Sequence, residues 1–340
     1  ISLRKFAPQT VRRLQRSTSH FMPSVVKLIN SLQTLTDSHS LGSSVSASVS
    51  DPSTSAAPEP CPTPLNWVEV VASVSEDTQR MAVPLDGGEL VADVYGSGPA
   101  LYFLGGATGS SRLFALTAYL LREELTSVML QPVEWTRSPR QPLEQVSEAT
   151  VRLANSLGHS SINVYAAGTG CHQALSLTQR HSARVGSLML QGPALRQPTL
   201  LRERVLHRIG QWLTRPVSTL PGWQKVQEQN HHRYFPPFDT TRFQFLLDDT
   251  GATPIRQAAY RWRAASETDW SALAPTIRCP VMVIRCEGEG AALAKLCEEF
   301  TAHVPGCRSE WLHTTGHYPY LTHPHRLVKL IKQFLNPPVA

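Results

Sequence analysis

Long apolar segments are missing from this chain. Of its 340 residues 41% are hydrophobic, yet no run approaches the ~18 consecutive apolar residues that a membrane-spanning helix requires. Charged residues make up 17%, and this ordinary balance excludes wholesale disorder, collagen-like repeats and coiled coils. At roughly 150 residues per domain, the length accommodates one large domain with an extension or an insert.

The cysteines form no Cys-x-x-Cys pair, and the last four are too loosely spaced to enclose a zinc ion. The six are Cys61, Cys171, Cys279, Cys286, Cys297 and Cys307. A chain long enough to bury a sizeable core does not need disulfides. We therefore expect no metal site, no cofactor and a reducing compartment.

Acidic residues are nearly absent from residues 1–50, where Asp37 stands against six basic residues for a net charge of +5. The basic residues are Arg4, Lys5, Arg12, Arg13, Arg16 and Lys27. An apolar series at helical spacing follows Pro23, so residues 1–36 are predicted to be a basic amphipathic arm. This composition is typical of mitochondrial targeting sequences, and equally of a helix that docks on the main domain or on a partner.

Residues 37–66 are rich in Ser, Pro, Thr and Ala. Such a composition buries too little apolar area to order itself, so we predict a linker.

From residue 67 onward, short apolar runs alternate with helical patterns. We expect strands at 67–74, 90–95, 100–104, 126–131, 161–166, 185–190, 280–285 and 308–313. Helices are expected at 110–124, 142–157, 170–181, 291–302 and 323–335. Repeated β-α-β units predict an α/β fold with a doubly wound, mostly parallel sheet over 67–340. Residues 195–276 interrupt the alternation and are predicted to form an insert.

The run from Val83 to Phe114 resembles the opening of the α/β-hydrolase superfamily, and the likeness covers most of residues 67–337. In that family a His-Gly pair after the third strand begins a loop that contributes a backbone N–H to the oxyanion hole. Gly105 and Gly106 stand at those two places, so the His is missing. The resemblance implies an oxyanion-like loop here, and a plain strand-to-helix turn is the alternative.

The run from Ile162 to Leu175 resembles the family's strand, G-x-S-x-G elbow and helix. With Ala166 and Gly170 at the small positions that flank the elbow, Gly168 occupies the place of the nucleophile. Glycine has no side chain that could form a covalent intermediate. The resemblance therefore implies a member of the superfamily without its nucleophile.

Two neighbouring residues are the alternative nucleophiles. Thr169 requires a shift of register by one residue, and it is also the residue whose backbone N–H would complete the oxyanion-like site. Cys171 lies three residues after Gly168 and is expected to pack inside the helix.

The remaining triad positions resemble those of the family. His317 precedes the last helix, at the catalytic-histidine position, and Glu289 follows the strand at 280–285, at the acid position, with Glu287 as the alternate. A histidine oriented by a carboxylate can act as a general base without any nucleophile. Alternatively, both are relics held by local hydrogen bonds.

The insert at 195–276 lies where the family carries a helical lid over the active site. Its residues 195–265 hold eleven basic and five acidic residues, interleaved with aromatics. Aromatics with arginines can bind single-stranded nucleic acid, or they can pack the lid onto the body while the arginines face water. We expect Arg202, Arg204 and Arg208, together with the arm, to contact a larger and partly anionic partner, either RNA or an acidic protein face.

Two classes of function follow. The favoured one is a catalytically inactive binding or assembly subunit, located in a mitochondrial complex or ribosome if the arm is a mitochondrial signature and in the cytoplasm otherwise. The second is a nucleophile-independent enzyme, a lyase or a cofactor-free oxygenase, with His317 as general base. A hydrolase that uses Thr169 or Cys171 is a minor third, and a small-molecule ligand in the pocket is compatible with each class.

Overall fold

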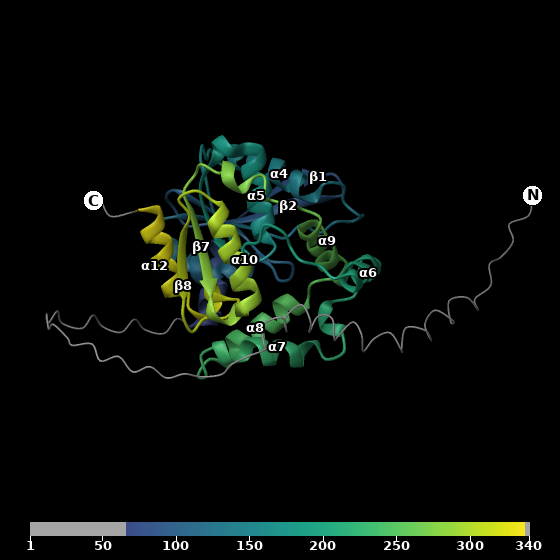
Figure 1. The fold of residues 1–340 in the computed structure, drawn as a ribbon. Coiled ribbons are helices and arrows are strands. Elements are labelled where there is room, and N and C mark those ends of the chain that lie inside the picture. The colour runs from purple at the N-terminus through teal and green to yellow at the C-terminus, as the bar shows by residue number, and fades with distance from the viewer. Residues whose placement is uncertain (1–65, 337–340) are drawn as a thin grey trace, which may run out of the picture.

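The computed structural model describes residues 66–336, so the predicted arm and nearly all of the predicted linker lie outside the described residues. Within this range the chain forms one eight-stranded sheet (Figure 1). Its strands are β1 (Gln79–Leu85), β2 (Gly88–Tyr95), β3 (Ala100–Leu104), β4 (Thr126–Leu130), β5 (Ile162–Ala167), β6 (Val185–Gln191), β7 (Val281–Cys286) and β8 (Arg308–Leu312).

The strands lie in the order β1-β2-β4-β3-β5-β6-β7-β8. The pairs β1–β2 and β2–β4 are antiparallel, and every other neighbouring pair is parallel. The predicted α/β architecture with a mostly parallel sheet is confirmed.

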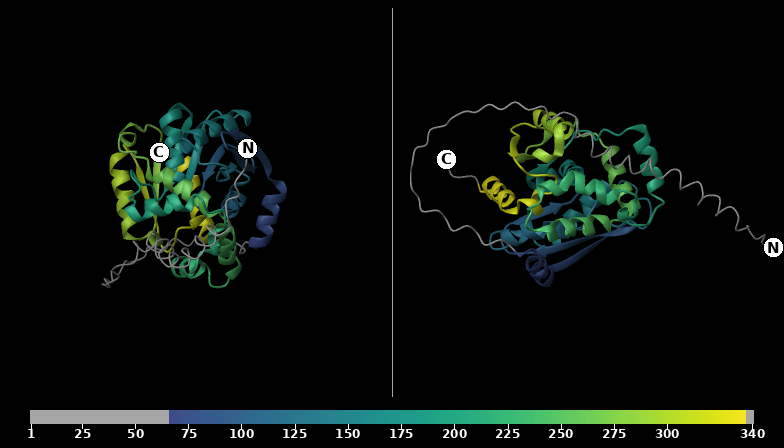
Figure 2. Two further views of the ribbon diagram at one scale, coloured as in Figure 1. Left: turned by 90° about the vertical axis from the view of Figure 1, so that its right-hand side faces the viewer. Right: turned by 90° about the horizontal axis from the view of Figure 1, so that it is seen from below.

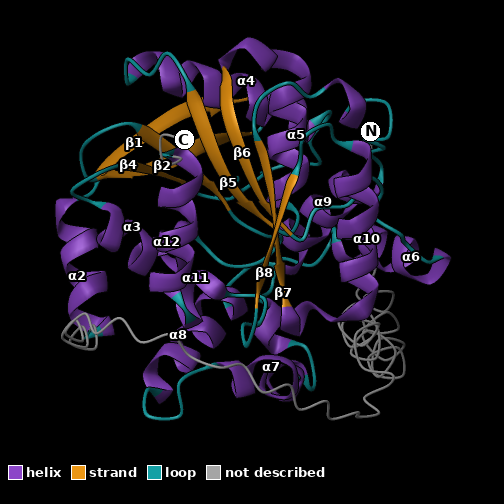
Figure 3. Ribbon diagram, turned by 60° about the vertical axis from the view of Figure 1, so that its left-hand side comes forward, coloured by secondary structure: helices purple, strands orange, loops and turns teal. Residues whose placement is uncertain are grey.

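Helices cover both faces of the sheet (Figure 3). One face packs against α4 (Pro142–Ser156), α5 (Gly170–His181) and α10 (Gly290–His303). The other packs against α2 (Trp67–Asp77), α3 (Ala115–Leu121), α11 (Pro319–Thr322) and α12 (Pro324–Leu335). Alternate residues of β3 enter the two cores, Phe103 on one side and Tyr102 on the other. A strand buried on both faces has no polar alternation, which is why the inner strands appear as continuous apolar runs in the sequence.

The strand expected at 67–74 is wrong, because these residues form α2. Its buried residues Trp67, Val70 and Val74 recur at helical spacing, and the Asn66 side chain accepts a hydrogen bond from the Val68 N–H at the helix start. The apolar period outweighs the β-branched composition of this segment. The expected helix at 110–124 is shorter than predicted: a 3₁₀ turn at Ser111–Phe114 precedes α3.

The insert forms four helices: α6 (Leu201–Gly210), α7 (Trp223–His231), α8 (Thr240–Gly251) and α9 (Ile255–Ser266). They lie beside the carboxyl ends of the parallel strands, as two views show (Figures 1 and 2). The lid helix α8 holds the loop after β3, since the Asp249 carboxylate accepts hydrogen bonds from the N–H and the hydroxyl of Ser110 at 2.6 and 2.7 Å. The helical lid that the sequence predicted is therefore present.

Candidate functional site

A two-residue turn joins β5 to α5, and Gly168 is at its tip. The backbone of Gly168 has φ +56°, in the left-handed region that glycine adopts without strain. Its N–H donates to the carbonyl of Gln191 at 3.1 Å, and its carbonyl accepts from the N–H of Cys171 at 3.0 Å. The chain thus changes from strand to helix over Gly168 and Thr169.

Close backbone contacts explain the small residues around this turn. A Cβ atom at Gly170 would lie 2.5 Å from the Leu104 carbonyl oxygen and 2.7 Å from that of Gly105, so only glycine allows α5 to begin here. At Gly168 itself, a Cβ atom would meet only the Cα of Gly106, at 3.8 Å. The position opposite the Gly105-Gly106 loop therefore has space for a side chain that the sequence does not supply.

The structure brings His317 next to Glu289. Nδ1 of His317 lies 3.7 Å from Oε1 of Glu289, which is an electrostatic contact longer than a hydrogen bond. Glu289 is buried, with its side chain 4% exposed, whereas the His317 side chain is 32% exposed. Oε2 of Glu289 accepts a hydrogen bond from the Cys286 N–H at 3.2 Å, which fixes the carboxylate after β7.

Gln191, at the end of β6, connects the three parts of the site. Its side-chain amide donates to Oε1 of Glu289 at 2.7 Å and to the His317 carbonyl at 2.9 Å, and its own carbonyl accepts from Gly168. The Tyr165 hydroxyl donates to Oε1, the side-chain oxygen of Gln191, at 2.7 Å. Sequence reasoning missed Gln191, although a polar residue closing an otherwise apolar strand was the available signal.

Glu287 has a different role from Glu289. It is exposed, and its carboxylate accepts a hydrogen bond from the N–H of Thr314 at 2.7 Å. Thr314 has φ +61°, so this bond supports a strained backbone in the loop that leads to His317. Of the two acidic residues considered from the sequence, Glu289 is the one beside the histidine.

Neither alternative nucleophile is activated. Burial raises the pKa of the Cys171 thiol well above its usual range, and Sγ donates to the carbonyls of Ala166 and Gln191. A thiol held neutral in this way is unreactive. Among residues 66–336, no hydrogen bond joins the Thr169 hydroxyl to a histidine.

The lid covers His317 with His231, the last residue of α7. The two rings meet edge to face with centroids 5.4 Å apart, and the ring of Tyr318 lies 5.1 Å from that of His231. His231 is only 2% exposed, and neither of its ring nitrogens has a hydrogen-bond partner. Burial, followed by the charge of His317, lowers the pKa of His231 to about 3. It is therefore a neutral imidazole at physiological pH.

The next lid residues complete this cover. The ring of Tyr234 lies against Gly288 and Gly316, where added Cβ atoms would approach it to 2.4 and 2.7 Å. Both glycines are in the loops that carry Glu289 and His317. The lid residue Tyr234 is therefore seated directly on the two loops of the acid and the histidine.

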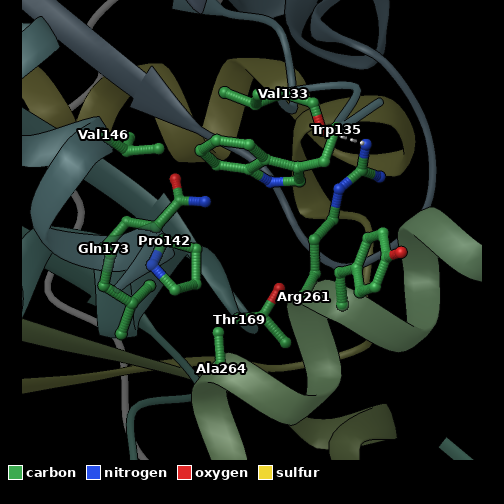
Figure 4. Close-up of a pocket in the computed structure, with 10 residues that line it drawn as sticks. Val133, Trp135, Pro142, Val146, Thr169, Gln173, Arg261 and Ala264 are labelled. Atoms are coloured by element: carbon green, nitrogen blue, oxygen red, sulfur yellow. Dashed lines mark hydrogen bonds between the residues drawn. The ribbon is translucent and has the colours of Figure 1, made fainter. Parts of the chain in front are cut away.

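A small cavity opens on the other side of the turn, between the body and the lid helix α9 (Figure 4). Its volume of about 20 Å³ is about the room that one water molecule needs. Arg261 enters it from α9 and donates to the carbonyls of Ala107 and Pro132 at 2.8 and 3.2 Å, while its Nε has no partner. Burial lowers the pKa of Arg261 to about 10. Thr169 and Gln173 line the cavity as well.

Within residues 66–336, no three His, Cys, Asp or Glu side chains are grouped in a way that could hold a metal ion. In the same part of the chain, no helix is long and apolar enough to span a membrane.

Comparisons with known proteins identify the architecture. No family model matches the chain, and no curated protein matches it. Solved structures match closely in shape: an esterase from Thermogutta terrifontis has a TM-score of 0.63 at 16% identity, over 76% of this chain and 98% of its own. The enol-lactonase from Burkholderia xenovorans gives 0.62 at 17% identity, over 75% and 99%.

An esterase from Exiguobacterium antarcticum gives a TM-score of 0.64 at 13% identity, over 76% of this chain and 99% of its own. Identities this low establish the fold alone. The chain has the α/β-hydrolase fold, complete along the length of these structures.

Proposed function

We propose that this chain is a catalytically inactive α/β-hydrolase-fold protein that serves as a binding or assembly subunit. The observation that carries the proposal is Gly168 at the tip of the β5–α5 turn, opposite Gly106, with no side chain to attack a substrate. The covalent route of the esterases that share this fold needs a nucleophile at such a turn.

The lid supports the same proposal. His231 and Tyr234 pack against the loops of Glu289 and His317, so the lid occupies the approach to the histidine. The cavity on the far side of the turn accommodates about one water molecule. A scaffold whose histidine is partly covered by its own lid, and whose cavity is this small, suits binding through its outer surface.

The direct test is labelling of the full chain with a fluorophosphonate probe, together with assays of esterase, lipase and thioesterase turnover. We expect no labelling and no turnover above background, because loss of a nucleophile alone costs on the order of 10⁶ in rate. Stoichiometric labelling that maps to Thr169 or to any serine near His317 would contradict the proposal. Thr169→Ala is the variant that separates a reactive threonine from non-specific labelling.

Gly168→Ser is the matched positive control. The structure has room for the added Cβ, although φ +56° is a strained conformation for serine, at a cost of order 1–3 kcal/mol. Labelling of this variant but not of the wild-type chain would mean that only the nucleophile has been lost. The absence of labelling in both would indicate that the remainder of the site has also changed, and it leaves the proposal intact.

The second candidate is a nucleophile-independent enzyme with His317 as general base, and a specific observation favours it. Glu289 is buried with its Oε1 3.7 Å from Nδ1 of His317, and Gln191 donates to Glu289 and to the backbone carbonyl of His317, so a carboxylate lies close enough to support a basic imidazole electrostatically. Metabolite turnover that His317→Gln abolishes, while the unfolding midpoint stays unchanged, would favour this enzyme over the assembly subunit.

We also propose that the partner is a larger assembly with an anionic contact face. The support is the distribution of charge, because residues 1–50 carry +5 and residues 195–265 carry +6 while the whole chain carries only +6. The proposed location is a mitochondrial complex or ribosome, and the support for it is the basic, amphipathic composition of the arm at residues 1–36. Co-migration of the chain with a large particle in native extract would support this, and migration alone with a bound metabolite would favour the enzyme.

A further inference from the structure

Exposed apolar side chains are concentrated on one short segment of the lid. Eight large apolar side chains are exposed in residues 66–336, and five of them lie between residues 200 and 212. These five are Leu200, Leu201, Val205, Ile209 and Trp212. Leu201 is 77% exposed and Trp212 86%, so packing within the chain does not account for them.

The helix α6 arranges these residues as a stripe. Successive residues of an α-helix are rotated by about 100°, so Leu201, Val205 and Ile209 fall within one sector of about 80°. The N–H of Trp212 bonds to the carbonyl of Ile209 at 3.1 Å, which continues the stripe into the next turn. We call these four residues, Leu201, Val205, Ile209 and Trp212, the α6 stripe.

The opposite face of α6 is buried and polar, the reverse of an ordinary surface helix. Glu203 and His207 are 2% and 9% exposed. His207 stacks on Trp262 of α9, and Gly210 lies against Ala259 of the same helix. The α6 stripe therefore points away from the protein while the polar residues hold the helix in place.

Three arginines flank the α6 stripe. At 100° per residue, Arg202 lies on one side of it and Arg204 and Arg208 on the other, and all three are exposed. None of them makes an ion pair within residues 66–336. The only acidic residue of the helix is the buried Glu203, whose carboxylate accepts from the Leu200 N–H at 2.7 Å.

Charge decides what can cover this surface. The chain's own residues 1–50 carry +5, and a second copy would bring the same arginines face to face, so both are repelled. The occupant must present negative charge and apolar area together. The helix is at the outer edge of the molecule (Figure 1), so an extended flat surface that presents both features, such as an anionic lipid leaflet, can reach the α6 stripe.

We propose that the α6 stripe inserts among the acyl chains of an anionic lipid surface while Arg202, Arg204 and Arg208 contact the headgroups. Aliphatic residues with a tryptophan on one face and arginines beside them are the composition of helices that lie in the plane of a membrane interface. Each arginine adds attraction to an anionic leaflet. This peripheral attachment goes beyond the proposed function and does not depend on it.

The test is flotation of the full chain with phosphatidylcholine vesicles that contain phosphatidylserine, and with phosphatidylcholine alone. The wild-type chain should partition onto the anionic vesicles. The variant Leu201→Ser/Val205→Ser/Ile209→Ser keeps every charge, including those of residues 1–50, and should partition about tenfold or more weakly, because each apolar side chain contributes to insertion. Phe238→Ser is the matched control, since Phe238 is 81% exposed elsewhere on the lid, and it should bind like the wild type.

Fluorescence gives an independent readout of insertion. The difference between the emission of the wild-type chain and that of Trp212→Phe reports Trp212, and it should shift to shorter wavelength when anionic vesicles are added. Failure of the wild type to float, equal flotation of the serine variant, or an unchanged Trp212 emission would each overturn the proposal. If the wild type ignores vesicles but joins an acidic protein complex through these same residues, the surface is a protein-docking site instead.

Discussion

His231 is a buried histidine whose two ring nitrogens have no hydrogen-bond partner in the described part of the chain. Such unpaired polar atoms each cost about 1–3 kcal/mol. His231→Phe fills a similar volume without them, so we expect an equal or higher free energy of unfolding at pH 7. Denaturant unfolding of the two chains measures this, and a loss of more than about 2 kcal/mol would mean that the imidazole has a partner in solution.

The same residue makes stability depend on pH. Burial first, then the charge of His317, lowers the pKa of His231 to about 3, against about 6.5 in the unfolded chain. The unfolded state therefore binds more protons, and stability falls as the pH falls from about 6.5 toward 3, by at most about 1.4 kcal/mol per pH unit.

His231→Phe should reduce this slope between pH 6.5 and 5, whereas Phe238→Ser, which changes an exposed lid residue and removes no titratable group, should not. Part of the slope will remain in the variant, because burial also lowers the pKa of His172, to about 4. An identical slope in the wild type and His231→Phe would refute the assignment.

Gly316 is the second residue that the lid depends on. A Cβ atom there would lie 2.7 Å from the ring of Tyr234, close to the base of that side chain, so the ring must move. We expect Gly316→Ala to destabilise the protein by about 1–3 kcal/mol. Gly105→Ala is the matched control, because its Cβ would meet the Phe114 ring at an ordinary 3.6 Å.

A double-mutant cycle identifies the cause. If the clash with Tyr234 is responsible, Gly316→Ala should cost little in a Tyr234→Ala background, which gives a coupling energy of about 1 kcal/mol or more. Equal costs in both backgrounds would place the strain in the backbone of the loop instead.

At the scale of elements, α9 attaches the lid to the body through Arg261 and Gln257. Arg261 donates to the carbonyls of Ala107, Pro132 and Val133. Gln257 exchanges two hydrogen bonds with the backbone of Trp135, at 3.0 and 2.9 Å. Through these bonds, backbone groups in the loops after β3 and β4 gain hydrogen-bond partners from the lid.

Removal of this anchor should loosen the lid. Arg261→Ala leaves three carbonyls with fewer donors, and we expect a loss of about 2–3 kcal/mol, since hydrogen bonds from charged groups are the strong ones. Limited proteolysis should then cut within residues 195–276 faster than in the wild type. Arg208→Ala should behave like the wild type, because Arg208 is exposed on α6 and makes no ion pair within residues 66–336. Equal cutting of both variants would show that the lid is held elsewhere.

Much of the element order could be predicted from sequence, for a physical reason. The inner strands β3 to β7 are buried on both faces and appear as apolar runs, and the turn at Gly168 was recognisable because close packing demands small residues around it. The start of the domain was wrongly predicted to be a strand. Val70 and Val74 are β-branched, which favours a strand, but their spacing of four residues favours the helix that the structure shows.

The cover of the candidate site could not be predicted. His231 contacts His317, and Tyr234 contacts Gly288 and Gly316. These residues are far apart in the sequence, and no periodic pattern of residue types indicates that they meet. Gln191 likewise gains its role only when β6 is placed between β5 and β7. Such contacts depend on how the lid packs, which is a property of the whole fold.

On the scale of the whole molecule, the lid contributes side chains to both hydrophobic cores of the body. Trp223, Phe235 and Phe243 of the lid belong to the same buried cluster as Phe103 and Tyr165 of the sheet. The charge is distributed differently, because the net positive charge lies in residues 1–50 and 195–265, with +5 and +6, while the rest of the chain is net negative. The lid therefore contributes both to the core and to the positive charge, whereas residues 1–50 carry their charge outside the residues that form the two cores.

Deletion of residues 1–50 tests folding and recruitment separately. The sheet and both cores lie within residues 66–336, so the shortened chain should keep the unfolding midpoint of the full chain. Its co-migration with a large particle should weaken, and the binding that remains should depend less steeply on salt than that of the full chain, because the deletion removes a net charge of +5 that salt would otherwise screen. Nuclease treatment should release the chain if RNA is the partner and leave it bound if the partner is an acidic protein face. Charge reversal at Arg202, Arg204 and Arg208 applies the same test to the lid, and weaker co-migration of that variant would assign these arginines to the particle rather than to a lipid surface. If both the deletion and the reversal leave co-migration unchanged, the positive charge does not recruit a partner, and the small-molecule enzyme becomes the better explanation of the fold.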